Sequence, residues 1–421
     1  MSAKKHVVIL GGGVGGLEAA TQLSHNSRVR ITLIDQNAVH IWKPVLHELA
    51  SGTIGQKGNL FAFNELAKRF GFTFIQSTMD TVDTTTKTLN LENGQVLNYD
   101  LLIVALGACA NDFGTPGAKE NCLFLNTLAD ANTIHERFRS LIERAQLTNK
   151  PVNMSIVGGG ATGVQLAAEL CQAIDNTPGL GPDARSKLLK PTLIEAQPRL
   201  LPPFPEQVSA EAKAELEKLG FDVITDGMVS EVGCGYIALK DGRRIDSDFP
   251  IWAAGVKACA ATSLLKDLEL SRSGQIMVGS TLQTTRDPSI YAIGDCARME
   301  VDPTAPTAQA ARQEGRYVGR IAIPRQLAGK PPVPFVYNDR GAVVALGDYN
   351  AWGMWPSKKG FGGHGLSAQL ARFIHEGLFR QHQMGLSGIF RTICATIGER
   401  FRPNNPDLNG KQKKQEKEEG K

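Results

Sequence analysis

The sequence has no long hydrophobic run. Its longest nearly unbroken apolar stretch, LLIVALGACA at residues 101–110, falls far short of the ~20 residues that a membrane-spanning helix needs. The first residues, MSAKK, lead directly into HVVILGGG and leave no room for the apolar core and cleavage site of a signal peptide. We therefore expect no membrane span and a location on the cytoplasmic side of a membrane.

The sequence also lacks paired cysteines. It has seven cysteines and no CxxC motif, which argues against a disulfide framework and against a dithiol redox centre. The histidines and cysteines do not have the spacing of metal ligands, so no metal site is expected. Most cysteines are predicted to be buried as small hydrophobic side chains.

What the sequence does contain is enough apolar material for several domains. With 421 residues, 42% of them hydrophobic, it predicts two or three globular domains. The net charge of +4 is concentrated in residues 350–402. That segment holds seven basic residues against two acidic ones, namely Lys358, Lys359, Arg372, Arg380, Arg391, Arg400 and Arg402 against Glu376 and Glu399. Residues 403–421 mix both signs and are predicted to form a disordered tail.

A glycine-rich turn near the N-terminus predicts a dinucleotide site. It has GxGxxG spacing between an apolar strand and a helix, and comprises Gly11, Gly12, Gly13, Gly15 and Gly16. Such glycines allow a tight turn, so that a pyrophosphate can sit at the positive N-terminus of the helix. The next predicted strand, VRITLID, ends at Asp35, where a carboxylate can accept a hydrogen bond from a ribose hydroxyl.

The same pattern occurs a second time. The second turn carries Gly158, Gly160, Thr162 and Gly163, and the following strand ends at Glu195. The polar insertion DNTPGLGPDARSKLLK explains why this acid comes later than the usual ~20 residues. A carboxylate there repels a 2′-phosphate and favours NADH over NADPH, although Arg199 lies nearby in the sequence.

Two dinucleotide turns in one chain predict hydride transfer between a nicotinamide and a flavin. We expect FAD in the N-terminal copy and NADH in the second. Small or acidic residues at further strand ends would lie against these cofactors, and they are Ala105, Gly107, Gly294 and Asp295 for FAD and Ala254 and Gly255 for NADH. The predicted fold is α/β, with two Rossmann-like domains and a C-terminal helical segment that associates with a membrane.

Both fingerprints, the stretch YAIGDCA and the AQxAxQ pattern in AQAARQ resemble the type II NADH dehydrogenases. These are single-subunit NADH:quinone oxidoreductases of the flavoprotein superfamily with two dinucleotide-binding domains. The resemblance runs from about His6 to about Pro403 and implies FAD, NADH and a membrane quinone. No proton pumping is expected.

The resemblance also implies roles for several polar residues. The helix opened by Ala308 and Gln309 would point its N-terminus at the flavin, where it stabilises negative charge by up to ~2 kcal/mol. Gln313 follows Gln309 by four residues and shares its helix face, so both amides could contact a quinone carbonyl; an ordinary exposed helix face is the alternative. Lys43 would lie near the flavin, unless it is a surface lysine. His40 and His47 are expected to be structural.

One position departs from the family pattern. Most relatives carry glutamate directly after TGV in the second fingerprint, close to the nicotinamide, whereas this chain has Gln165. Glutamine keeps the hydrogen bonds but cannot titrate. Proton delivery to quinone through this position is therefore in doubt, and water or Gln313 would have to serve.

The C-terminal segment predicts an anchor on an anionic lipid surface. Apolar residues recur at helical spacing in two stretches, namely Leu366, Leu370, Phe373, Ile374 and Leu378, then Leu386, Ile389, Phe390, Ile393 and Ile397. Arg372, His375, Glu376 and Arg380 fall mostly on the other face of the first helix. Basic charge and the upstream Trp352 and Trp355 fit an interfacial helix. Packing on the protein's own core or on a second subunit is the alternative.

The expected organisation interleaves the domains. FAD-binding sequence occupies residues 1–114 and 265–345, the NADH domain 115–264, the anchor 346–402 and the tail 403–421. Three other functions stay open: a reductase of a ferredoxin-like carrier, a sulfide:quinone oxidoreductase, which needs positioned cysteines, and a non-catalytic NADH sensor. Nucleic acid is not an expected partner, and a homodimer stays open.

Overall fold

The chain folds into two compact units. The computed structural model describes residues 3–389 except 57 and 182, together with residues 392, 393 and 396. As far as these residues extend, the first unit comprises Met1–Pro44, Asn59–Cys109 and Val256–Asn338, and the second comprises Val45–Gly58, Ala110–Gly255 and Asp339–Lys421. Each unit is therefore assembled from three separate stretches of chain.

The first unit is built on a parallel sheet with the strand order β21–β9–β1–β2–β5. These strands are β1 (Lys5–Leu10), β2 (Val29–Asp35), β5 (Thr73–Gln76), β9 (Leu101–Val104) and β21 (Ile290–Ala292). At the centre, Val8 of β1 lies opposite Thr32 of β2 and Leu102 of β9. Residues 7–10 are buried, as expected for a parallel strand that is covered on both faces.

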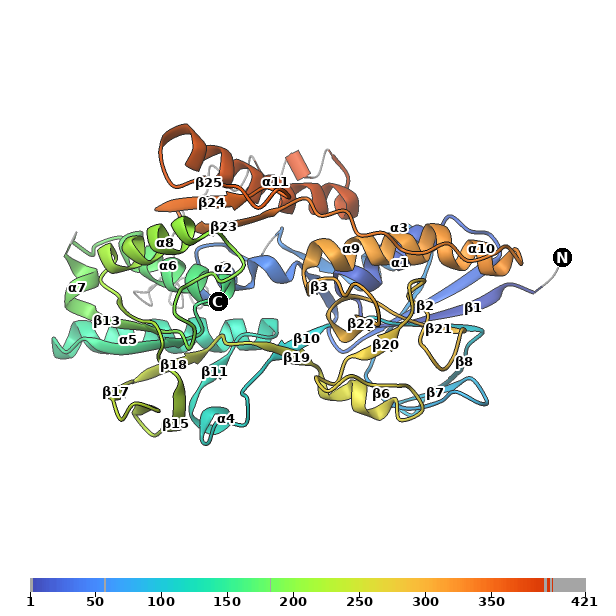
Figure 1. Cartoon of the computed structure of the whole chain (residues 1–421), viewed down its shortest axis with the longest axis horizontal. Coiled ribbons are helices and arrows are strands. Elements are labelled where there is room, and N and C mark those ends of the chain that lie inside the picture. The colour runs from blue at the N-terminus through green and yellow to red at the C-terminus, as the bar shows by residue number, and fades with distance from the viewer. Residues whose placement is uncertain (1–2, 57, 182, 390–391, 394–395, 397–421) are drawn as a thin grey trace, which may run out of the picture. The chain divides into compact units, whose positions relative to one another are not determined.

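Helices and smaller sheets surround this first sheet. The helices are α1 (Val14–Leu23), α3 (Phe63–Phe70), α9 (Ala308–Tyr317) and α10 (Ile323–Leu327), with a π-helical turn, η4 (Val318–Ala322), between the last two. Figure 1 shows α1 beside α9, and the two are in contact along their length. The remaining strands are β3 (Val39–Ile41), β4 (Leu60–Ala62), β6 (Met79–Asp83), β7 (Thr88–Leu91), β8 (Val96–Asn98), β10 (Ala108–Ala110), β19 (Val256–Ala258), β20 (Ile276–Val278) and β22 (Ala297–Met299). Three 3₁₀ turns complete the unit, η1 (Lys43–Val45), η2 (Ala260–Leu264) and η3 (Gly294–Cys296).

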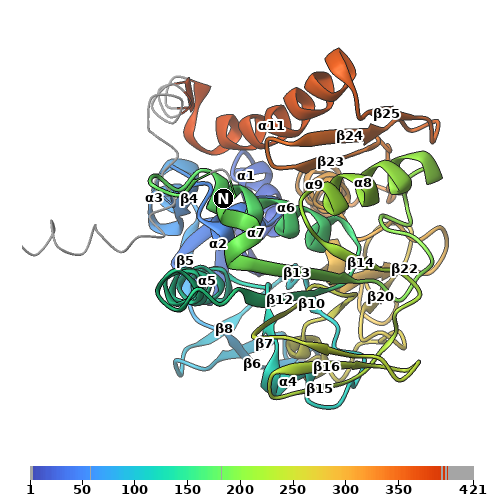
Figure 2. The same cartoon turned by 90° about the vertical axis from the view of Figure 1, so that its left-hand side faces the viewer.

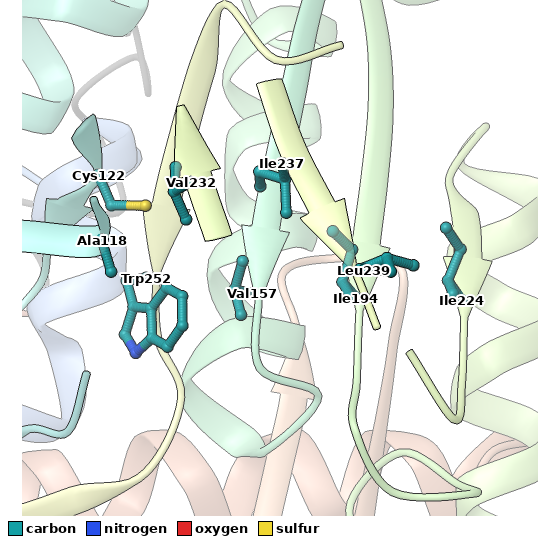
Figure 3. Close-up of a cluster of buried hydrophobic side chains, with 9 residues drawn as sticks. All are labelled: Ala118, Cys122, Val157, Ile194, Ile224, Val232, Ile237, Leu239 and Trp252. Atoms are coloured by element: carbon teal, nitrogen blue, oxygen red, sulfur yellow. The ribbon is translucent and has the colours of Figure 1, made fainter. Parts of the chain in front are cut away.

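The second unit repeats the parallel arrangement with the strand order β11–β18–β12–β13–β14. These strands are β11 (Leu123–Phe124), β12 (Val152–Val157), β13 (Leu189–Ile194), β14 (Asp222–Ile224) and β18 (Phe249–Trp252). The helices are α2 (Leu46–Ser51), α4 (Ala118–Asn121), α5 (Leu128–Thr148), α6 (Ala161–Asp175), α7 (Ala184–Leu188) and α8 (Glu206–Lys218). An antiparallel sheet of β15 (Val229–Gly233), β16 (Tyr236–Leu239) and β17 (Arg244–Asp246) packs on the parallel one through the apolar cluster drawn in Figure 3.

The C-terminal part of the second unit is a small sheet covered by a long helix. The sheet consists of β23 (Ala342–Leu346), β24 (Asn350–Met354) and β25 (Gly360–Gly362), and the helix is α11 (Gly365–Ser387). Figure 2 shows α11 lying along this sheet, in agreement with its contacts to all three strands. The helix approaches closely because the buried contact is made by Ala345, Ala351 and Ala371.

Two parallel sheets of this kind confirm the predicted α/β class with two Rossmann-like domains. The chain passes between the units after Cys109 and after Gly255, a few residues before the sequence-based boundaries at 114 and 264. The inclusion of Val45–Gly58 in the second unit was not predicted. The predicted tail, residues 403–421, lies outside the described residues.

The predicted anchor segment is partly corrected. Helix α11 spans the first amphipathic stretch, whereas most of the second stretch lies outside the described residues. Trp352 is not an interfacial anchor, because it is only 1% exposed and its indole Nε1 donates a hydrogen bond to Glu211. Trp355 is partly exposed and stacks on Phe361. In the described part of the chain, no helix is both long and apolar enough to cross a bilayer.

Candidate active site

The first glycine turn joins β1 to α1 through close backbone contacts. Gly11 has a φ of +98°, and a Cβ there would lie 2.4 Å from the carbonyl oxygen of Ala105. A Cβ on Gly16 would lie 1.9 Å from the carbonyl oxygen of Gly11. Because no side chain fits at these distances, the two glycines let the start of α1 pack directly against the turn.

The carboxylate at the end of β2 closes this turn. Asp35 accepts hydrogen bonds from the backbone N–H of Gly12 at 2.7 Å and of Asn37 at 2.8 Å. Nδ1 of the buried His40 lies 2.8 Å from the carbonyl oxygen of Gly12. Burial lowers the pKa of His40 to about 4, so the ring is neutral at neutral pH and supports the turn, as expected of a structural histidine.

The second turn is closed in the same way as the first. A Cβ on Gly163 would again lie 1.9 Å from the carbonyl oxygen of the first glycine, here Gly158, whose φ is +117°. Glu195 accepts hydrogen bonds from the N–H of Gly159 at 2.6 Å and of Gln197 at 2.7 Å. The two units thus contain the same arrangement of a glycine turn and a strand-end carboxylate, which we call a cradle.

Each cradle has open space where a pyrophosphate would lie. Gly13 is the N-cap of α1 and Gly160 the N-cap of α6, and a Cβ on either would meet no atom within 4 Å. Thr162 is exposed in the first turn of α6. Free space, glycine and a helix N-terminus are what a dinucleotide phosphate requires, so both turns fit the cofactors that the sequence predicts.

Arg199 does not serve the second cradle. Its guanidinium donates to the carbonyl oxygens of Pro202 and Phe204, each at 2.6 Å, and to the hydroxyl of Ser209 at 2.8 Å. These bonds hold the loop before α8. Arg199 is therefore engaged by this loop and not by the Glu195 carboxylate at the end of β13.

The strand ends beside the second cradle are also shaped by backbone contacts. A Cβ on Gly158 would lie 2.8 Å from the carbonyl of Ala253. Ala254 accepts a hydrogen bond from the N–H of Asn111 at 3.3 Å, and Gly255 has a φ of +62°. Ala254 and Gly255 thus follow β18 beside the second glycine turn.

A cavity of about 240 Å³ in the first unit lies beside Asp295, which the sequence predicts to contact the flavin. It is lined by Ala108, Lys257, Gln275, Asp295, Arg298 and Thr304, among others. Burial raises the pKa of Asp295, and the charge of Lys43 opposes that shift. Nζ of Lys43 donates a hydrogen bond to the carbonyl oxygen of Ala108 at 2.9 Å, and Gly107 turns the chain there with a φ of +67°.

Helix α9 is fixed against α1 by glycine. A Cβ on Gly315 would lie 2.3 Å from the carbonyl oxygen of Gly15, so the two backbones touch. The helix begins at Ala308, where the hydroxyl of Thr307 accepts a hydrogen bond from the N–H of Ala310 at 3.1 Å. The turn before Asp295 meets this helix closely, since a Cβ on Gly294 would be 3.3 Å from that of Ala311.

The two glutamines of α9 share one face, as their spacing predicts. Nε2 of Gln309 donates to the hydroxyl of Tyr337 at 2.9 Å. The amide of Gln313 donates to the carbonyl oxygen of Asn338 at 2.9 Å and accepts from its N–H at 3.0 Å. Both side chains are thus engaged by the segment that follows α10.

Gln165 lies in the second unit on α6 and is buried. Its Nε2 is 3.4 Å from Nε2 of His375 on α11. Burial lowers the pKa of His375, and burial together with His375 lowers that of His47 to about 3. Gln165 therefore faces an uncharged ring, with which a neutral amide is compatible.

A family model described as pyridine nucleotide-disulphide oxidoreductase matches residues 5–315. The type II NADH:quinone oxidoreductase of Haemophilus influenzae is 36% identical to this chain over 430 aligned residues, which cover 94% of the chain and 96% of that protein. The chain belongs to the type II NADH:quinone oxidoreductase family.

Two other similar proteins are more distant in sequence. The type II NADH:quinone oxidoreductase of Staphylococcus aureus is 29% identical, with 83% of this chain and 90% of that protein covered. The solved structure of NDH2 from Plasmodium falciparum in complex with NADH matches with a TM-score of 0.84 at 21% identity, covering 96% of this chain and 99% of that one. At this identity, the structural match shows a shared fold.

Sequence reasoning missed one buried carboxylate in this family member. Glu314 on α9 accepts hydrogen bonds from the N–H of Gly294 at 2.5 Å and the hydroxyl of Thr304 at 3.0 Å. Burial raises its pKa, and these hydrogen bonds oppose the shift. It ties the turn before Asp295 to α9. The available signal was that Glu314 directly precedes Gly315, which predicts a carboxylate next to a close helix contact.

Proposed function

We propose that this chain transfers the hydride of NADH to FAD and passes the electrons on to a quinone dissolved in a membrane. The observation that supports this most directly is that both units of this type II NADH:quinone oxidoreductase family member contain a glycine turn closed by a strand-end carboxylate. When bound, the flavin accepts a hydride and releases electrons to an acceptor. The protein supplies binding, orientation and electrostatics.

The two cradles assign the two dinucleotides. The first turn and Asp35 would hold FAD, with Lys43 and Asp295 beside its flavin end. The second turn and Glu195 would hold NADH. Because the carboxylate of Glu195 repels a 2′-phosphate and Arg199 is bonded elsewhere, NADPH is disfavoured.

The acceptor side is assigned to α9. The N-terminus of this helix, at Ala308 and Gln309, offers positive potential next to the turn that carries Asp295. The amides of Gln309 and Gln313 can donate to a quinone carbonyl if they exchange their bonds to Tyr337 and Asn338. Gln165 cannot carry a proton, so it is assigned a positioning role only.

Helix α11 is proposed to rest on a lipid surface. Its exposed face carries Leu366 (82% exposed), Leu370 and Phe373 (73% exposed). The face towards the protein carries Ala371 and His375. On a helix that faces water, the large apolar side chains point towards the protein. On α11 they point outwards, as expected of a helix that lies in a lipid interface.

Charge contributes less to this lipid contact than the sequence predicts. Arg372 lies 3.9 Å from Asp348 and also donates to its carbonyl oxygen at 2.6 Å. Lys358 lies 3.9 Å from Asp339. Both acids lie before residue 350. Counting the charges of residues 350–402 alone therefore overstates the positive potential of this segment. The apolar face is therefore the main support for the proposed membrane contact.

Anaerobic titration with NADH, followed by a short-chain quinone, tests the proposed reaction. One equivalent of NADH should bleach one flavin, and the quinone should restore the colour. Restoration by a ferredoxin-like carrier but not by quinone would identify a carrier reductase, and bleaching by sulfide in place of NADH would identify a sulfide oxidoreductase. Bleaching that no acceptor reverses would indicate a sensor.

A further inference from the structure

Two cysteines that the proposed reaction does not use lie side by side in the first unit. Cys109 is in β10, and Cys259 directly follows β19, the strand that pairs with β10. Their sulfur atoms are 2.6 Å apart, although 150 residues separate them in sequence. The sequence argued against a dithiol centre because it has no CxxC motif. The pair is instead created by the pairing of two distant strands.

We propose that Cys109 and Cys259 are a reversible oxidation site, at which a peroxide converts the two thiols into a disulfide. The two sulfur atoms are already 2.6 Å apart, so a small approach brings them to the ~2.05 Å of a disulfide bond. Both side chains are half-buried, so a molecule as small as hydrogen peroxide can reach them. Among the other cysteines that the structure describes, Cys122, Cys171 and Cys296 are buried and Cys234 is exposed.

The surroundings give the two sulfur atoms different roles. The hydrogen bond with Cys109 and burial raise the pKa of Cys259, while the charge of Lys43 opposes this shift. Either sulfur can donate across the 2.6 Å contact between them. The proposal assigns the thiolate that attacks peroxide to Cys109 and the thiol that then forms the disulfide to Cys259.

The reaction balances with hydrogen peroxide as the oxidant. The Cys109 thiolate attacks one peroxide oxygen, the O–O bond breaks, and the other oxygen leaves as water after taking up a proton. The sulfur of Cys259 then attacks the Cys109 sulfenic acid, releasing a second water and forming the S–S bond. Two thiols and one peroxide give one disulfide and two waters, and two electrons pass from sulfur to oxygen.

The proposed disulfide would link the two ends of the chain segment that runs through the second unit. The chain leaves the first unit after Cys109 and returns to it at Val256. A disulfide from Cys109 to Cys259 would close this whole excursion, including the cradle assigned to NADH, into one covalent loop. Oxidation would thus join the two connecting strands β10 and β19, and a dithiol reductant would release them.

The test uses the full-length protein with its flavin. After treatment with hydrogen peroxide and alkylation under denaturing conditions, the protein should lose two of its seven thiols. Peptide mapping should then show a peptide containing Cys109 linked to one containing Cys259, and dithiothreitol should reverse the link. Full alkylation of both cysteines would overturn the proposal, as would Cys109 oxidised to sulfinic acid without a link.

Variants separate the two roles. In Cys259→Ser, Cys109 should stop at the sulfenic acid, which dimedone traps, and Cys259→Ala provides the same measurement should the serine variant fold poorly. The matched control Cys234→Ser should form the link as the unmodified chain does. Loss of two thiols per chain in Cys259→Ser would overturn the assignment, because a different pair would then be responding to peroxide.

Discussion

Gly160 and Gly163 stand three residues apart in the second cradle, yet a methyl group would meet opposite surroundings at each. At Gly160 it would meet no atom within 4 Å, and at Gly163 it would lie 1.9 Å from the carbonyl oxygen of Gly158. Only the first position has room, but that room is where a phosphate is expected.

Alanine at these two positions should therefore have different effects. Gly160→Ala should leave thermal stability unchanged and raise the KM for NADH about tenfold or more, a loss of roughly 1.4 kcal/mol. Gly163→Ala should lower the free energy of unfolding by about 2 kcal/mol or more, because α6 must move away from the turn. Calorimetry and steady-state kinetics measure the two effects. Equal loss of stability in both variants would contradict the distinction.

The carboxylate of Glu195 should set nucleotide preference. Replacing it with glutamine removes the repulsion of a 2′-phosphate while keeping a hydrogen-bond acceptor for the N–H of Gly159. Glu195→Gln should raise the ratio of kcat/KM for NADPH to that for NADH about 10- to 100-fold, or roughly 1–3 kcal/mol. The exposed Glu206→Gln, in the same unit, is the control and should leave the ratio unchanged. An unchanged ratio in Glu195→Gln would remove this carboxylate from the explanation.

Among elements, α6 is held to the C-terminal segment by a stripe of polar side chains. Gln165 meets His375, Gln172 donates to the carboxylate of Asp348 at 2.8 Å, and Tyr349 donates to Asp175 at 2.6 Å. Glu169 lies within this stripe and contacts the hydroxyl of Thr53. Burial raises the pKa of Glu169 to about 7; the bond to Thr53 opposes the shift and the charge of Asp348 adds to it.

Glu169 should make stability depend on pH in a particular direction. The folded chain keeps a proton that the unfolded chain has already lost, so its contribution is complete below the ordinary carboxyl pKa and disappears as pH rises to about 7. Glu169→Gln imitates the protonated form. Between pH 5 and pH 8, the free energy of unfolding of this variant should change by about 1–3 kcal/mol less than that of the unmodified chain. Urea unfolding at several pH values measures this, with Glu206→Gln as control. A variant with the unmodified pH dependence would show that Glu169 is ionised throughout.

Helix α11 gives a second prediction at this scale. Replacing Leu366 and Phe373 together with serine should weaken sedimentation with anionic vesicles about 10- to 100-fold, because two large apolar side chains no longer enter the lipid. Stability should change little, since both are exposed. Gln369→Ser, at another exposed position of α11, is the control. NADH oxidation with a short-chain quinone should persist, so undiminished vesicle binding would count against the lipid contact alone.

At the scale of the whole molecule, each unit combines three stretches of chain, so bound cofactor should contribute strongly to stability. FAD binds the folded first unit and not the unfolded chain, and at 100 times its dissociation constant it contributes about 2.7 kcal/mol. Removing the flavin should lower the unfolding midpoint by about 5–10 °C. Calorimetry before and after reconstitution checks this, with recovery of the midpoint on adding FAD as control. A midpoint indifferent to FAD would contradict the assigned site.

The parts that sequence predicted are those fixed by local geometry. GxGxxG spacing locates both cradles, because Gly16 and Gly163 each pack on the carbonyl oxygen of the glycine five residues earlier. The Cys109–Cys259 pair escaped prediction because 150 residues separate the two cysteines. Glu314 escaped prediction because its partners, Gly294 and Thr304, lie outside the helix that carries it. Trp352 was misassigned because an aromatic residue next to a basic segment has the same pattern whether its indole faces lipid or, as here, Glu211.

Both cradles are closed by the same kind of contact, in which a strand-end carboxylate accepts a hydrogen bond from the N–H of the second glycine. The first cradle is closed by Asp35 and the second by Glu195. A substitution at either acid should therefore change the nucleotide preference of one cradle and leave the turn of the other intact. The second cradle thus provides an internal reference, because nucleotide binding by a substituted cradle can be compared with binding by the unchanged cradle of the same molecule.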